Sequence, residues 1–348
     1  MELLLTHYEK WSELYNCSKM STSQWEAERN PFRTLGVFYC SLGTTTITAY
    51  LICLKVMWGL RQNSCYKIMM QIGVMDVSTL LINTLFAGYV AFNGFSFCDI
   101  PLSNYVLGSI VVGTWANCCA SSIMLAINRS IELWFPSKMS AIFGGYRILP
   151  WMAVPFAYQF YFTWYTPACT YNSKAHAWFY YPFAGFSAYD DLDQTLYANI
   201  PEDIHNVSTC FIIAGFYVFL TFTLWYKSRN TSNRAVTTMQ KKLIIQACYI
   251  CSFELAACLL YTYIHYVEIR LWLNVLTNMC WISCNCGAAV IYITLNETIR
   301  RGFLETVLPK FALEKLQPKS TVFSTTVFGH SSVAPRMSVW VDEHHAVC

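Results

Sequence analysis

An all-α membrane protein with a bundle of seven transmembrane helices is the fold class that the sequence predicts. Of its 348 residues, 55% are hydrophobic and only 12% are charged, about half the charged fraction of an average soluble domain. Seven apolar runs are long enough to cross a bilayer as helices. Lysine and arginine are also distributed unevenly between the segments that join these runs. Such a bias is typical of a protein with a fixed orientation in a membrane.

The third apolar run shows most clearly how the chain meets the membrane. From Ser103 to Asn128 there are 26 residues without a charge, and then come Arg129 and Glu132. An arginine directly after such a run marks a membrane face, which we predict to be the inner one. With ends defined to a few residues, the seven runs are 34–58, 66–92, 103–128, 147–165, 207–226, 243–267 and 271–295.

The distribution of basic residues predicts the orientation. Seven spans place the two termini on opposite sides of the membrane. The segments on the side of residues 1–33 hold 6 lysines and arginines, whereas those on the side of residues 296–348 hold 17. Since cytoplasmic segments carry the excess of basic residues, we expect residues 1–33 to form an extracellular N-terminus.

Two glycosylation sequons agree with this orientation. Asn16 and Asn206 begin Asn-x-Ser sequences on the predicted outer side, so we expect them to be glycosylation sites. Asn206 lies close to the predicted membrane face. The long outer segment 166–206 is acidic, with a single lysine.

Cysteines on the outer side predict a disulfide. Cys98 precedes the third run, and Cys169 lies in the long loop after the fourth. Because the outside is oxidising, we predict a Cys98–Cys169 bond, with Cys17 as a rival partner. The other cysteines are mostly in apolar runs. No Cys-x-x-Cys pair has downstream histidines at zinc-finger spacing, so we expect no metal site and no cofactor. A net charge of +3 is too small to indicate nucleic-acid binding.

Two acidic residues lie midway along predicted spans, Asp76 in the second and Glu254 in the sixth. Such groups are costly in hydrocarbon unless they face the bundle interior. One interpretation is hydrogen bonding between helices. The alternatives are an ion-linked switch at Asp76 and a ligand contact at Glu254.

The segment after the seventh run predicts an amphipathic helix on the inner leaflet, over residues 296–316. Apolar residues from Ile299 to Phe311 share one helical face, with lysines and arginines around them. Pro309 is expected to bend or end its first half. Residues 317–348 are rich in Ser, Thr and Val, and we predict a disordered cytoplasmic tail.

Several local patterns resemble the rhodopsin-like G-protein-coupled receptors. GVMD at 73–76 is similar to that class's aspartate motif in span two, and Trp151 lies early in the fourth run. NRS at 128–130 stands in place of an acidic-Arg-aromatic triplet, and AAVIY at 288–292 in place of Asn-Pro-x-x-Tyr. No acidic residue precedes the arginine, and the sixth run has no proline. These departures indicate a divergent branch.

A closer resemblance is to the nematode serpentine chemoreceptors of class T. It is carried by stretches spread along most of the membrane domain: Asn30-Pro31, 64–76, 97–108, 115–133 and 291–300. The resemblance implies a chemosensory receptor in the plasma membrane of a sensory neuron, at its cilium.

The resemblance implies binding rather than catalysis, with a small-molecule ligand outside, a heterotrimeric G protein inside and lipid around the bundle. It implies roles in switching and coupling for Asp76, Arg129, Tyr292 and the loop Lys227–Lys242, although membrane-face charge alone explains that loop. For ligand contacts we expect residues that core packing would explain equally well: Trp115, Asn117, Glu254, Tyr261, Asn278 and Trp281.

Other functional classes fit the sequence less well. None of the seven histidines lies mid-span, as an intramembrane hydrolase would need. A retinal pigment needs a lysine in span seven, and Leu271–Leu295 contains none. A ligand-gated channel or transporter is the remaining alternative, but the sequence shows no internal repeat that would favour one.

Overall fold

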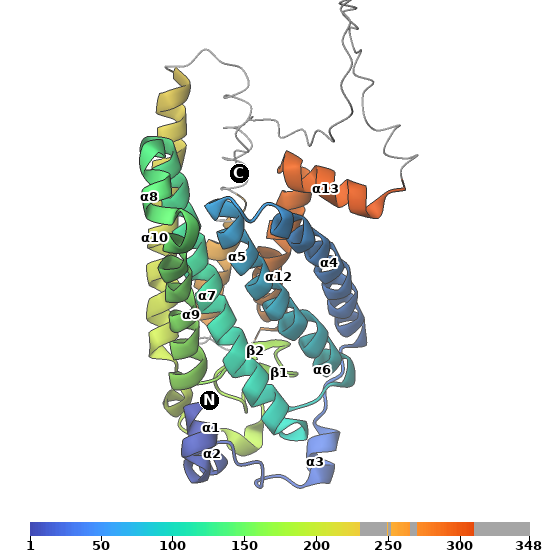
Figure 1. The fold of residues 1–348 in the computed structure, drawn as a ribbon. Helices are drawn as coiled ribbons and strands as arrows, with labels where there is room; N and C mark the ends of the chain where they lie inside the picture. Colours follow the sequence, from blue (N-terminus) through green and yellow to red (C-terminus); the bar gives the residue numbers. More distant parts are fainter. Residues whose placement is uncertain (230–248, 250–251, 265–269, 310–348) are drawn as a thin grey trace, which may run out of the picture.

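The computed structural model describes residues 1–229, 249, 252–264 and 270–309. The predicted tail 317–348 and most of the loop Lys227–Lys242 lie outside the described residues. In the described part, long helices lie side by side as a bundle, with the N-terminus at one end and α13 at the other (Figure 1). We call the end with the N-terminus the outer end, following the predicted orientation, and the opposite end the inner end.

Helices occupy all seven predicted spans, which confirms the fold class. Five are long and apolar enough to cross a membrane: Arg33–Gly59, Ser64–Asn93, Pro101–Trp134, Ile200–Thr223 and Leu271–Thr294. The seven are α4 (Arg33–Gly59), α5 with α6 (Ser64–Leu80 and Ala87–Asn93), α7 (Pro101–Trp134), α9 (Ile148–Tyr165), α10 (Ile200–Arg229), the described helix Ser252–Ile264 and α12 (Leu271–Thr294).

Helix α7 packs against α5, α9 and α10. Its approach to α9 depends on Gly113, where an added Cβ would lie 1.9 Å from Oγ1 of Thr163. Small residues allow helix backbones in membranes to pack this closely. The charge-free run identified in the sequence therefore packs against three of the other spans.

A π-helical turn, Leu81–Phe86, interrupts the second span between α5 and α6. Such turns add a residue to one helical turn and are frequent at functional sites. Here Asn83 lies inside the turn, and its side chain is fully buried. The turn thus places a polar amide in the bundle interior.

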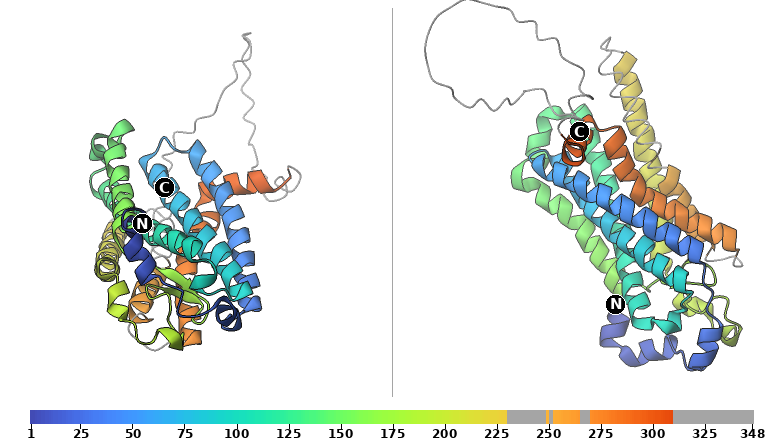
Figure 2. Two further views of the ribbon diagram at one scale, coloured as in Figure 1. Left: turned by 90° about the horizontal axis from the view of Figure 1, so that it is seen from below. Right: turned by 90° about the vertical axis from the view of Figure 1, so that its right-hand side faces the viewer.

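The outer end is covered by short elements from two distant parts of the chain. One of them is a hairpin, in which β1 and β2 pair antiparallel with Tyr171 opposite Trp178. Seen from that end, these elements lie across the bundle (Figure 2, left). They are α1 (Glu2–Thr6), α2 (Tyr8–Leu14), α3 (Thr22–Ala27), the strands β1 (Thr170–Asn172) and β2 (Ala177–Phe179), and the 3-10 turns Ser187–Tyr189 and Gln194–Tyr197.

The predicted Cys98–Cys169 disulfide is wrong, because Cys98 pairs with Cys17. Cys169 instead lies against α7, where its thiol donates to the carbonyl oxygen of Gly108 at 3.5 Å. Gly108 is seven residues into α7, roughly 10 Å along the helix axis from Pro101. The bond therefore joins the N-terminal segment, not the long loop, to the start of α7.

Ion pairs add to this attachment. Arg29 donates two hydrogen bonds to Oδ1 of Asp99, at 2.6 and 3.0 Å. Lys174 in the hairpin turn pairs with Glu28. The carboxylate of Asp99 is almost fully buried, and charge-assisted hydrogen bonds to such a group are the stronger kind.

The inner end carries the short helices α8 (Met139–Phe143) and α13 (Glu297–Val307). The side chain of Asn296 caps α13 by accepting from the Ile299 amide at 3.0 Å, which is a strongly preferred arrangement. Ile299 is fully buried, and Gly302 lies against Val56 of α4. The helix ends as Leu308 turns to extended backbone before Pro309, as residues preceding proline commonly do. Residues 310–316 of the predicted helix lie outside the described part.

Candidate functional site

An aromatic cluster around Trp281 joins several spans in the outer half of the bundle. The ring of Trp281 on α12 contacts Tyr261 at 5.2 Å, Trp115 of α7 at 5.8 Å and Trp178 of the hairpin at 6.5 Å, between ring centroids. All three are edge-to-face contacts, which aromatic pairs prefer. Three of the predicted ligand-contact residues, on three different helices, therefore meet at one point.

A small cavity lies beside this cluster. Its volume is about 20 Å³, which is room for a water molecule. In this arrangement a larger ligand can enter only if side chains move. The cavity is lined by Trp115, Cys169, Trp178, Tyr180, Glu202, Asn206, Ala257, Cys258, Tyr261 and Trp281.

The hairpin supplies Trp178 to the lining of the cavity, and sequence reasoning missed this residue. Trp178 is fully buried, and its indole nitrogen donates to Oδ1 of Asn83 in the π-helical turn at 2.7 Å. A run of four aromatic residues at 178–181 in the outer loop was the available signal. Because aromatic side chains in loops are often merely surface residues, that signal alone does not place Trp178 inside the bundle.

Two further predicted ligand residues are amides with different surroundings. Asn278 accepts a hydrogen bond from Tyr261 at 2.9 Å, directly behind the cluster. Asn117 lines neither this cavity nor the groove described below. Its amide is bonded to Gln159 of α9 and Ser121 of α7. Gln71 of α5 also donates to Oδ1 of Asn117, at 3.5 Å, so Asn117 connects three helices.

Asn206 is buried in α10, where its side-chain oxygen accepts from the Trp115 indole at 3.0 Å. A glycan cannot be attached to an amide in this position, so the predicted site at Asn206 is wrong. The α10 helix begins at Ile200, earlier than the apolar run predicted, and this takes the sequon into the bundle. Asn16 remains a predicted site, and its side chain is exposed.

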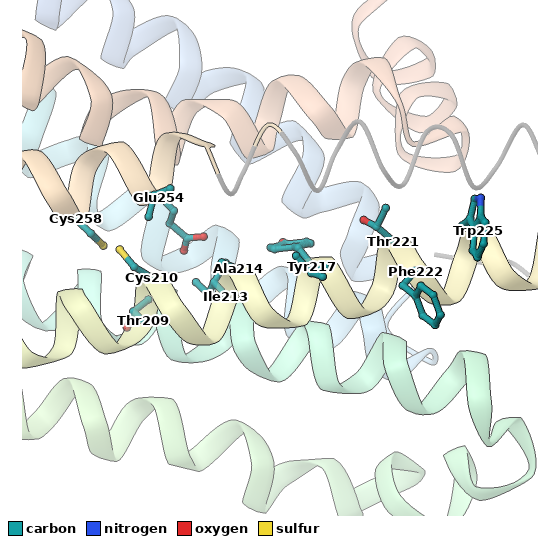
Figure 3. A pocket seen from close by; sticks show the side chains of 12 residues that line it. Thr209, Cys210, Ile213, Ala214, Tyr217, Thr221, Phe222, Trp225, Glu254 and Cys258 are labelled. Carbon is teal, nitrogen blue, oxygen red and sulfur yellow. The ribbon is translucent and has the colours of Figure 1, made fainter.

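A second and larger cavity opens on the side of the bundle, between α10 and the helix Ser252–Ile264 (Figure 3). Its volume is about 700 Å³. Glu254, another predicted ligand residue, points into it, while the Trp281 cluster lies elsewhere. We call this cavity the α10 groove. Its described lining is Thr209, Cys210, Ile213, Ala214, Tyr217, Val218, Thr221, Phe222, Trp225, Glu254, Leu255 and Cys258.

Asp76 lies in a buried network between four spans. Tyr50 of α4 donates to its Oδ2 at 2.5 Å, and the Cys118 thiol of α7 lies 3.4 Å from its Oδ1. The ring of Tyr292 on α12 packs edge-to-face on Tyr50, 6.0 Å away. Two of the predicted switch residues, Asp76 and Tyr292, are thus connected through Tyr50, which sequence reasoning did not single out.

Arg129 lies in the last turns of α7, at the inner end. Its guanidinium pairs with Glu132, one turn along the same helix, at 3.1 Å. The neighbouring Asn128 is buried and donates to Ser64 at the start of α5 at 3.2 Å. Asn128, which stands in place of the usual acidic residue, therefore connects two spans. The acidic partner Glu132 follows Arg129 in the sequence instead of preceding it.

The comparison with family models decides the relationship. The family described as serpentine type 7TM GPCR chemoreceptor Srt matches residues 2–316. The chain belongs to the Srt family. Among curated proteins, it is similar to serpentine receptor class T-55 of Caenorhabditis elegans, with 23% identity over 312 residues. This match covers 87% of the chain and 83% of that receptor.

Membership of the Srt family confirms the predicted resemblance and makes the chain a multi-pass membrane protein of a chemoreceptor family. Srt is a family of receptors, not of enzymes. In the part of this chain that the structure describes, predicted ligand-contact residues line the cavity at Trp281 and the α10 groove.

Proposed function

We propose that this Srt chain is a chemosensory receptor that binds a small molecule between its helices and signals through a heterotrimeric G protein at its inner end. The observation that carries the proposal is the position of Trp281, in contact with rings from α7, the helix Ser252–Ile264 and the hairpin. A ligand that displaces any of these rings changes how three elements pack. Such a ligand switches the receptor only if it binds one arrangement more tightly than the other.

The inner half supplies a path from that cluster to the predicted coupling site. Helix α7 carries Trp115 in the cluster, Cys118 on Asp76 and Arg129 at the inner end. Helix α12 carries Trp281 and Tyr292. A relative shift of these two helices would alter the Asp76 network and the surroundings of Arg129 together. In this proposal the receptor lies in the plasma membrane of a sensory neuron, with its N-terminus outside.

Signalling in a heterologous cell tests the proposal. The full chain is expressed with a promiscuous G-protein α subunit and a second-messenger reporter, and is exposed to a panel of volatile and water-soluble small molecules. We expect Arg129→Ala to abolish the response to any active compound. Arg147→Ala is the matched control, because Arg147 is an exposed arginine at the same end of the bundle. Surface expression is measured for every variant.

Ligand binding is tested with a variant and a matched control on α12. Trp281→Ala should shift the half-maximal concentration by at least about tenfold, a change of ~1.4 kcal/mol. Trp272→Ala should leave it unchanged, because Trp272 is 65% exposed on the same helix. An unaltered response in Arg129→Ala would exclude the coupling role of that residue. A ligand-evoked current that persists without a G protein would instead identify a ligand-gated channel.

A further inference from the structure

The α10 groove contains a buried acidic group without a hydrogen-bond partner. Glu254 is only 6% exposed, and its Oε2 has no partner in the part of the chain that the structure describes. Figure 3 shows its side chain reaching from the helix Ser252–Ile264 toward α10. A carboxylate in such surroundings is costly unless something supplies a donor or an opposite charge. No lysine, arginine or histidine is among the described residues that line the groove.

The rest of the groove is apolar and opens sideways. Beyond Glu254, its walls are mostly aliphatic and aromatic, and at its inner end lie Phe222 and Trp225. Val218 and Phe222 are 70% and 57% exposed on the side of the bundle, the side that faces lipid in a membrane-spanning receptor. From Ala214 to Trp225 the groove extends along roughly 16 Å of α10. A molecule dissolved in the membrane can reach it without crossing the outer end.

The outer end has a separate cavity of about 390 Å³ beside the N-terminal helices and Tyr105, and none of the predicted ligand-contact residues lines it. Trp178 is fully buried against the ring of Trp281, and the neighbouring cavity has a volume of about 20 Å³ against about 700 Å³ in the groove. Cys258 lines both spaces. The groove and the cavity beside the aromatic cluster that we assign to ligand detection therefore share a wall at Cys258.

We propose that the α10 groove binds a membrane-partitioning amphiphile whose protonated amine pairs with Glu254 and whose alkyl chain lies along α10 toward Trp225. The amine supplies the counter-charge that the described lining lacks, and the apolar walls accommodate the chain. The proposal rests on the proposed receptor function insofar as it names the class of ligand, but binding itself can be measured without any G protein.

Photolabelling of the purified full chain in phosphatidylcholine nanodiscs tests the proposal. The probe is a hexadecylamine with a diazirine in its chain, and the comparison probe is a palmitic acid with the diazirine at the same carbon. Peptide mapping by mass spectrometry should place the amine label on α10 or Ser252–Ile264. Unlabelled hexadecylamine should compete with it, and the acid probe should label these segments much less.

Two variants and a matched control test whether the labelling is specific to the α10 groove. Glu254→Gln should weaken competition by hexadecylamine at least about tenfold. Ala214→Trp should do the same by filling the groove while leaving the carboxylate in place. Ala157→Trp is the control, because Ala157 is exposed on α9 and outside the described lining, and its labelling should equal that of the parent.

Three results would overturn the proposal or the function behind it. Equal labelling by the amine and acid probes, or labelling insensitive to both groove variants, would show contact with bulk lipid only. Equal binding of the corresponding alcohol probe would show that Glu254 needs a hydrogen-bond donor and not a cation. If the labelling behaves as expected but the receptor never signals, the proposed function would be contradicted. The ligand class proposed for the groove would not be.

Discussion

The outer end of α7 and the membrane-facing side of α10 are stabilised in opposite ways. At the outer end, the Cys17–Cys98 bond and the Arg29–Asp99 pair attach covering segments to the bundle. Along α10, large apolar side chains are exposed and border a groove of about 700 Å³. Regions with few buried contacts open at the lowest free-energy cost. We infer that the outer end is the fixed part of this receptor, while α10 and its neighbour have room to move.

Asn104 shows how closely the outer end is joined. Its amide both donates to the carbonyl of Tyr171 at 3.0 Å and accepts from the Tyr171 amide at 2.8 Å. The hairpin is thereby held on α7 by a pair of buried hydrogen bonds, each worth about 1 kcal/mol in net terms and more if one partner is removed. Across the groove, by contrast, Cys210 of α10 meets Cys258 of Ser252–Ile264 through their thiols, which are weak hydrogen-bonding groups.

The largest expected effect is at Trp178. Trp178→Ala removes a fully buried indole and leaves Oδ1 of Asn83 without its donor, so we expect a loss of about 3–5 kcal/mol in unfolding free energy. Thermal denaturation of the purified receptor in detergent measures it. Trp178→Phe is the control and should lose less, because most of the ring is retained. A loss below about 1 kcal/mol in the alanine variant would show that the hairpin is not a fixed part of the core.

The disulfide gives the next largest effect. Cys17→Ser should cost about 2–4 kcal/mol, because the bond closes a long loop in the unfolded chain. Cys98→Ser should cost the same, and the double variant no more than either alone. Cys169→Ser should change stability by less than about 1 kcal/mol, because the serine hydroxyl can donate to the Gly108 carbonyl in place of the thiol. If Cys169→Ser were as damaging as Cys98→Ser, the pairing in the outer end would have to be reassigned.

Acid should destabilise the outer end of the bundle through protonation of His176. Burial lowers the pKa of His176 from 6.5 to about 4, so the unfolded chain binds more protons than the folded one between these values. Its contribution to stability is full above about pH 6.5 and declines as the pH falls toward 4, by roughly 2 kcal/mol at pH 5.

The measurement is the melting temperature at pH 7.5 and pH 5, compared between the parent and His176→Gln. The variant should be less sensitive to acid than the parent. His7→Gln, at an exposed histidine, should keep the parent's sensitivity. Equal slopes in all three proteins would contradict the role of His176.

The smallest effect is expected in the α10 groove. Phe222→Ala should lower stability by less than about 1 kcal/mol, because the ring is already 57% exposed. It should nevertheless weaken hexadecylamine competition if the alkyl chain lies along this helix. A stability loss as large as that of Trp178→Ala would remove the contrast between the two regions.

Much of the site could be predicted from residue type and position, but not which residues meet. Trp115, Tyr261 and Trp281 are aromatic residues in spans, and the structure brings them together around one cavity. Asn117 is also buried within a span, yet it lies on another face of α7, where it is hydrogen-bonded to Gln159 of α9. A rotation of about 100° per residue separates these faces, and a sequence without known neighbours does not show which face looks inward.

The sequence by itself determined the seven-helix fold class and the resemblance to the Srt family, and it predicted the approximate ends of the spans and their orientation. It could do so because hydrophobic length and the placement of charge are local properties that the bilayer imposes on each span. The partner of Cys98, the burial of Asn206 and the space beside Glu254 were decided only by the tertiary structure. These depend on how far each helix extends and which neighbour it packs against, and such distances exist only once the whole bundle has formed.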